Sequence, residues 1–141
     1  MALYPFKDLI FQITDTGGGL RDVSPYLTDA SLKLLRELID SVAAGDGGYR
    51  FQPGLQKSTI ELDFLWSEDA NVGPDVVFGG LYTHTAATAW DMGAEGKSTG
   101  DIKYSGNCWV ESWEITGKVA GLMSGHASIK IDNTVTRGTY A

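Results

Sequence analysis

The sequence predicts a mostly β protein of about seven strands and one short α-helix, and two observations carry that prediction. The first is an alternation of apolar and polar side chains near the C-terminus, where residues 107–132 indicate two long strands. The second of these strands has apolar odd positions and polar even positions: Met123, Ala127, Ile129 and Ile131 against Ser124, His126, Ser128, Lys130 and Asp132. The other observation is the glycine content, 18 residues without a period, which is typical of a β-rich chain with many turns.

The first strand of this C-terminal pair also divides into two faces. One face has Trp109, Trp113 and Ile115 with Glu111 among them, and the other has Cys108, Val110, Ser112, Glu114 and Thr116. Residues 117–121 (GKVAG) supply the glycines of the connecting turn. Because two strands alone are marginally stable, the pair predicts a larger sheet around it.

The N-terminal third begins with a predicted strand at residues 9–14, which ends at the glycines of residues 17–19. Residues 21–26 form a bend that leads into a second strand at 27–33. Residues 31–43 fit two interpretations. An amphipathic helix would align Leu35, Leu38, Ile39 and Val42 on one stripe, and local propensity favours it. A strand over the same residues is the alternative.

A long polar loop follows from residue 45 to about residue 57, and it contains Tyr49 and Phe51 among glycines. Two interpretations are equally open. Exposed aromatic side chains in a projecting loop indicate a partner surface. Alternatively, the two rings fold back on their own sheet.

The middle of the chain has the clearest isolated strand, residues 58–66, in which Ile60, Leu62, Phe64 and Trp66 alternate with Thr59, Glu61, Asp63 and Leu65. Residues 71–75 (NVGPD) resemble a helix start, and Val77, Phe78 and Leu81 would be the buried stripe of a helix of two or three turns. A strand at 83–92, a loop at 93–100 and the start of another strand at 101–104 complete the expected elements.

Length and composition describe one ordinary globular domain over residues 1–141, with 43% apolar and 21% charged residues. No stretch approaches the roughly 20 apolar residues that span a bilayer, and the first residues lack a secretion signal, so we expect folding in a cytoplasm and no membrane partner. The net charge of −7 argues against a protein that grips nucleic acid by neutralising phosphates. The single cysteine, Cys108, has no internal disulfide partner and is expected to be a small core or sheet-face residue.

The usual signatures of catalysis, metal binding and nucleotide binding are missing or weak. Gly96-Lys97-Ser98 resembles the end of a phosphate-binding loop, but Asp91 stands where that motif needs its first glycine. His84 and His126 are far apart in the sequence, and His126 is expected to be a plain surface histidine. We therefore expect no catalytic residues, no metal and no cofactor.

Two minor alternatives remain at this point. Glu61 and Asp63, or Glu111 near the tryptophans, would fit a small sugar-cleaving hydrolase. Trp and Tyr side chains on a sheet would fit a carbohydrate-binding β-sandwich, and this is the leading alternative function.

Several short stretches follow one another along the chain: LTDAS at 27–31, RELID at 36–40, GD at 45–46, YRFQPGL at 49–55, STIEL at 58–62 and VTRGT at 135–139. In this order they resemble the major tail tube proteins of long-tailed bacteriophages and related gene-transfer particles. The resemblance runs over residues 9–139. It implies an antiparallel β-sandwich or partly closed barrel with a flanking helix and a long extended loop. It also favours the strand interpretation near residues 36–42, although Leu34-Leu35 departs from the family pattern.

The resemblance further implies a structural virion protein without enzymatic activity, six copies of which form a ring. Rings stack into the tail tube through which DNA passes to the host. The expected partners are therefore further copies of the chain, other tail proteins (tip, terminator and tape measure) and DNA in transit, with assembly in the bacterial host cytoplasm and a final place in the virion tail. Residues 43–57 are the expected inter-ring arm, with contacts through Tyr49, Arg50, Phe51, Gln52 and Leu55.

An inner surface that conducts DNA should be polar and net negative, because clustered Lys or Arg would hold phosphates. The residues expected to face the lumen are Thr59, Glu61, Asp63, Ser128 and Asp132. Lys130 is the awkward member of the same strand face, and its charge would need an adjacent or cross-strand carboxylate.

Overall fold

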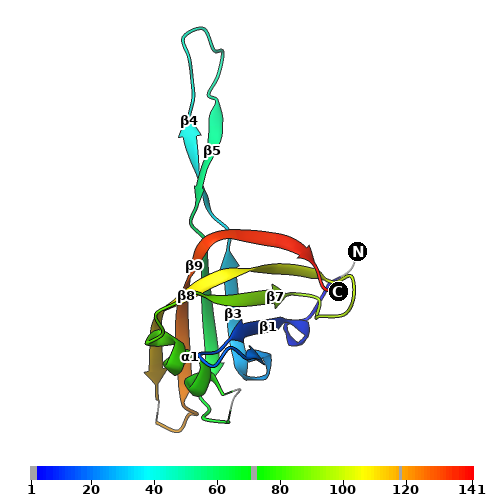
Figure 1. Cartoon of the computed structure of the whole chain (residues 1–141), viewed down its shortest axis with the longest axis vertical. Helices are drawn as coiled ribbons and strands as arrows, with labels where there is room; N and C mark the ends of the chain where they lie inside the picture. Colours follow the sequence, from blue (N-terminus) through cyan, green and yellow to red (C-terminus); the bar gives the residue numbers. More distant parts are fainter. Residues whose placement is uncertain (1–2, 71–72, 118) are drawn as a thin grey trace.

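The computed structural model describes residues 3–70, 73–117 and 119–141, which fold around a curled sheet (Figure 1). Seven antiparallel strands lie in the order β2-β1-β7-β8-β9-β6-β3, and β4 and β5 pair separately as a hairpin. The elements in chain order are η1 (Phe6–Asp8), β1 (Ile10–Thr14), β2 (Leu20–Asp22), η2 (Ser24–Tyr26), β3 (Leu27–Lys33), β4 (Arg36–Asp40), β5 (Phe51–Gln56), β6 (Thr59–Leu65), α1 (Pro74–Tyr82), β7 (Thr88–Gly93), β8 (Ile102–Thr116) and β9 (Ser124–Thr139). The mostly β prediction with one short helix is confirmed.

The sheet curls because its two longest strands, β8 and β9, carry irregularities in their pairing. The register between them shifts between Ser105 and Asn107 and again between Val110 and Ser112. Opposite the first shift, Asn133 adopts a left-handed backbone conformation with φ of 66°. Since a bulge bends a strand and increases its twist, the shifts fold the sheet into a partly closed barrel.

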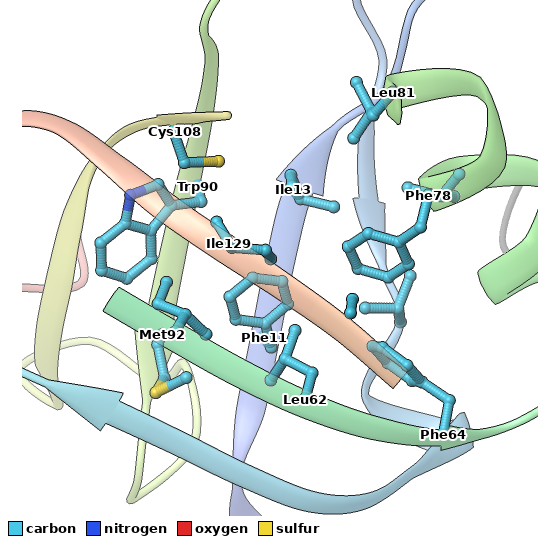
Figure 2. Close-up of a cluster of buried hydrophobic side chains, with 14 residues drawn as sticks. Phe11, Ile13, Leu62, Phe64, Phe78, Leu81, Trp90, Met92, Cys108 and Ile129 are labelled. Carbon is cyan, nitrogen blue, oxygen red and sulfur yellow. The ribbon is translucent and has the colours of Figure 1, made fainter. Parts of the chain in front are cut away.

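The hydrophobic core lies inside this curl, under helix α1 (Figure 2). Val77, Phe78 and Leu81 are buried on α1, as predicted, and Pro74 opens its first turn. Phe78 lies 5.0 Å from Phe64 between ring centroids. At the other end of the core, Trp90 stacks on Phe11 at 6.3 Å. The helix is therefore packed on the core through the aromatic contacts of Phe78.

The alternation predicted for β6 is confirmed, since Ile60, Leu62 and Phe64 are fully buried. The alternation predicted for β8 is wrong after Val110. Because the register slips by one residue there, Trp113 turns to the core side and stacks on Phe78 at 5.7 Å, whereas Trp109 stays on the opposite face. The two tryptophans that the sequence pattern placed together are thus separated by a bulge.

Other boundaries also differ from the sequence prediction. Residues 83–87 precede β7 rather than belonging to it, whereas the strand expected to start at 101–104 does start there, as β8. β9 runs seven residues past the expected end at Asp132, and Met123 lies just before this strand with 46% of its surface exposed. β2 overlaps the start of the stretch assigned to a bend. Asn71, Val72 and Lys118, which belonged to the expected helix start and turn, lie outside the described residues.

Residues 31–43 contain strand and no helix, which decides the open question for this segment. β3 pairs with β6 up to Lys33, and β4 then leaves the barrel to pair with β5. The expected long loop at 43–57 is therefore only partly a loop, because Phe51–Gln56 is strand β5. Pro53 is tolerated in this strand since, in the part of the chain that the structure describes, the hairpin has no further strand neighbour that needs its missing N–H.

Candidate assembly surfaces

One face of the four strands β8, β9, β6 and β3 is mostly polar, with Trp109 and Leu65 as apolar members, and we call it the polar face. Strand register places each of its members opposite another: Asp29, Ser31 and Lys33 on β3; Thr59, Glu61 and Asp63 on β6; Ser124, His126, Ser128 and Lys130 on β9; and Ser112, Glu114 and Thr116 on β8. The apolar side chains between them, such as Leu62 and Ile129, point into the core. This face includes four of the five residues predicted for the lumen: Thr59, Glu61, Asp63 and Ser128. The fifth, Asp132, is exposed and continues β9 on the same side, beyond the end of β6.

His126 is at the centre of the polar face and bridges two carboxylates. Its Nδ1 lies 2.6 Å from Asp63 Oδ1 and its Nε2 lies 2.9 Å from Glu61 Oε2. Ser128 donates its hydroxyl hydrogen to the other oxygen of Glu61 at 2.9 Å. The hydrogen bond to Asp63, reinforced by the charges of Asp63 and Glu61, raises the pKa of His126 above its usual value.

The sequence pattern placed His126 on the right face but missed this bridge. Two carboxylates at alternate positions of one strand, opposite a histidine of the next, would be the signal for it. That signal can be seen only once the register Asp63↔His126 is known.

The positive charge of Lys130 is offset by a neighbouring carboxylate, as expected for a lysine on the polar face. Its Nζ lies 3.4 Å from Glu111 Oε2, on the neighbouring strand β8, and the side chains of both residues are about half exposed. Besides Lys33 and Lys130, the charged members of this region are carboxylates on all four strands: Asp29, Glu61, Asp63, Glu111, Glu114 and Asp132. The described surface is therefore net negative.

The β4–β5 hairpin with its connecting residues projects far beyond the barrel, and we call it the arm (Figure 1). Its chain connection closes with a 2.9 Å hydrogen bond from Ser41 N to Arg50 O, and Asp46 accepts a hydrogen bond from Ala43 N at 2.7 Å. An Arg50–Asp46 ion pair at 3.4 Å lies in the same loop. These local bonds give the arm an ordered end without any support from the core.

The arm exposes apolar side chains along its length. Tyr49 and Leu55 each have 81% of their surface exposed, and Phe51 has 56%. The rings of Tyr49 and Phe51 stack on each other at 6.4 Å rather than on the barrel, so the interpretation that they fold back on their own sheet is wrong. Leu38, Ile39 and Val42 add further exposed apolar surface. Apolar surface held away from the body of a protein is typical of a binding surface. All five residues predicted for the arm lie on this hairpin or its connecting loop: Tyr49, Arg50, Phe51, Gln52 and Leu55.

The four strands behind the polar face have two open edges. β3 pairs with β6 and, within the described residues, with no second strand. β8 pairs with β7 only from Tyr104 to Cys108, so its second half, up to Thr116, pairs with β9 alone. Open edges present unpaired N–H and C=O groups to another chain.

The described residues offer little for the two alternative functions. Trp109 and Trp113 lie on opposite faces and cannot form one platform for a sugar ring. No group of three or more His, Cys, Asp or Glu side chains within the described ranges is arranged to hold a metal ion. Cys108 is buried, and burial raises the pKa of its thiol to about 12, so it stays protonated and unreactive. No helix among the described residues is long and apolar enough to cross a membrane.

Comparison with known proteins identifies the fold. No protein-family model matches the chain, and no curated protein matches it in sequence. Among solved structures, the tail of an empty gene transfer agent particle superimposes with a TM-score of 0.77 at 13% identity, over 97% of this chain and 100% of that one. The tail tube of SPP1 gives a TM-score of 0.75 at 14% identity, over 97% of this chain and 80% of that one. The chain has the tail tube fold.

The tail tube fold also covers more distant structures. The sheath–tube complex of an extracellular contractile injection system gives a TM-score of 0.65 at 10% identity, over 97% of this chain and 92% of that one. The fold expected from the resemblance in the sequence is thus confirmed over almost the whole chain.

Proposed function

We propose that the protein is a structural subunit that assembles into hexameric rings, and that the rings stack into a tail tube through which DNA passes. The observation that carries this proposal is the combination of the tail tube fold with a polar face bounded by two open edges. The tail of the gene transfer agent particle in the comparison has C6 symmetry, which supports six copies in each ring.

The strand directions favour closure of a ring. Each of the pairs β8–β9, β9–β6 and β6–β3 is antiparallel, so β8 and β3 run in opposite directions. When the β3 edge of one copy meets the β8 edge of the next, the new pair is antiparallel as well. A continuous antiparallel wall results, and the contact between unlike edges repeats around a ring until it closes.

The polar face then lines the bore of this ring. Its carboxylates disfavour lasting contact with phosphates, so DNA passes without being held. Thr59, Glu61, Asp63, Ser128 and Asp132 keep their proposed lumen positions, and His126 joins them. The arm, through Tyr49, Arg50, Phe51, Gln52 and Leu55, reaches a neighbouring ring. The further partners in this proposal are tip, terminator and tape measure proteins, with assembly in a bacterial cytoplasm and a final place in the virion tail as one domain per subunit.

Self-assembly of the purified chain tests the proposal directly. We expect negative-stain electron microscopy to show rings or tubes of uniform diameter at high protein concentration, with sixfold symmetry in end-on views. A chain that stays monomeric by light scattering at millimolar concentration, with tail-tip proteins added, would contradict it.

A further inference from the structure

The base of the arm contains an apolar groove that the barrel leaves open. Its volume is about 320 Å³, and its lining includes Leu34, Leu35, Tyr104 and Val135 together with Arg36 and Arg137. Leu34 and Leu35 each have about half of their surface exposed. Their exposure is a cost to the isolated chain that an occupant would remove.

The two arginines make the groove selective for an occupant that carries negative charge. Neither Arg36 nor Arg137 forms an ion pair with a described carboxylate within 4.0 Å. A fitting occupant therefore combines apolar side chains with a carboxylate, since a charged side chain in an interface favours an opposite charge on the partner.

The opposite end of the same chain has this combination. The turn between β8 and β9 exposes Val119 completely and Leu122 by 77%, and Met123 is about half exposed. A hydrogen bond of 2.9 Å from Trp66 N to Met123 O joins this turn to the loop after β6, which exposes Glu68. We call these residues the distal tip.

The groove and the distal tip lie at opposite ends of one strand ladder. Ser58, at the groove, precedes β6, and Leu65 ends β6 beside the tip, so about 20 Å of extended chain separates them. Figure 1 shows the arm rising from one end of β6 and the β8–β9 turn at the other.

From this placement we propose that the groove at the base of the arm binds the distal tip of a second copy of this chain, with Val119 and Leu122 on the leucines and Glu68 facing Arg36 and Arg137. The inference rests on the proposed function. It names the two surfaces that meet where one ring contacts the next. Because the two surfaces are unlike and lie at opposite ends, the contact adds copies head to tail without closing.

A pair of introduced cysteines tests the contact. Cys108 is buried, so it does not compete for oxidation. We expect the double variant Leu34→Cys/Val119→Cys to give a ladder of disulfide-linked dimers, trimers and longer chains on a non-reducing gel after mild oxidation. Each single variant, which has one surface thiol, yields dimers at most. A double variant that yields only monomers and dimers overturns the proposal.

A charge exchange tests the partner chemistry independently. Arg137→Glu and Glu68→Arg should each raise the concentration needed for tube growth on the order of tenfold, since the six weak contacts of each ring act together. The combined variant should recover wild-type growth. Lys7→Glu, on η1, is the matched control and should have no effect, and a cooperative melting transition confirms folding in each case.

The two proposals fail in different ways. If the wild-type chain forms tubes and neither Arg137→Glu nor Glu68→Arg changes tube growth, the groove contact is overturned and the tail tube function stands. A wild-type chain that forms no rings or tubes overturns the function and this inference with it.

Discussion

At the scale of single residues, the polar face shows how strand register creates an interaction that residue types alone do not reveal. Glu61 and Asp63 are two positions apart on β6, so their carboxylates are on one face and repel each other. The imidazole of His126 lies between them and offsets that repulsion, with contacts at 2.6 and 2.9 Å. The polar face therefore contains a local charge balance within a net negative surface.

The pKa shift of His126 predicts a pH-dependent stability. Because its pKa is raised in the folded state, the bridge adds stability that is complete below the unfolded value of about 6.5 and is lost as pH rises through the folded pKa. His126→Gln should therefore lower the free energy of unfolding more at pH 5.5 than at pH 9. With 38% of the side chain exposed, solvent screening limits this pH-dependent part to about 0.5 kcal/mol.

Urea unfolding across this pH range measures the effect, and His84→Gln is the control histidine variant. A loss of stability in His126→Gln that is the same at both pH values would show that His126 acts by packing rather than through its charge.

At the scale of elements, the arm is separable from the barrel. It is a hairpin whose apolar side chains are exposed, so it contributes almost nothing to the core in Figure 2. Its strands are held by pairing between β4 and β5, and its base by the hydrogen bond of Val135 N to Gln56 Oε1 at 3.2 Å. An isolated two-stranded hairpin is only marginally stable in water. We therefore interpret the exposed hairpin as a segment that a partner stabilises.

Shortening the arm predicts a folded subunit that does not elongate. Replacing residues 41–50 with Asn-Gly supplies a tight two-residue turn and keeps the β4–β5 pairing. The free energy of unfolding should change by less than about 1 kcal/mol, since surface changes away from the core have small effects. Tube growth should be lost, because Tyr49 and Arg50 are residue types in which interfaces concentrate binding energy.

Thermal melting and electron microscopy measure the two halves of this prediction. Loss of the cooperative transition would show that the barrel needs the end of the arm, and normal tubes would show that the end of the arm is dispensable for stacking.

At the scale of the whole molecule, the placement of charge is what the proposed bore depends on. Asp29 and Glu114 lie near the two edges of the polar face, one on β3 and one on β8. Neither carboxylate takes part in the His126 bridge. They can therefore be changed without breaking that interaction.

Reversing these charges should make the bore retain DNA. In tubes of Asp29→Lys/Glu114→Lys, we expect short duplex DNA to become protected from nuclease at low salt and to be released as salt rises, because lysine contacts to phosphates depend strongly on salt. Wild-type tubes should protect none. Asp8→Lys/Glu95→Lys makes the same change in net charge on η1 and on the loop after β7. Equal protection by this control would contradict the assignment of the polar face to the bore.

The sequence by itself determined the elements whose side-chain pattern is local and uninterrupted. The alternation in β6, the buried stripe Val77, Phe78 and Leu81 of α1, and the polar positions of β9 all depend only on period and neighbours, so they could be predicted. The order of short stretches along the chain was enough to indicate the tail tube fold.

Only the tertiary structure decided the features that depend on contacts distant in sequence. The bulge after Val110 sends Trp113 into the core, because aromatic packing on Phe78 outweighs regular alternation. β4 is a strand despite a helical periodicity, because pairing with β5 satisfies its backbone. The His126 bridge and the groove at the base of the arm each join residues from strands that meet only after folding, so no local pattern could have placed them.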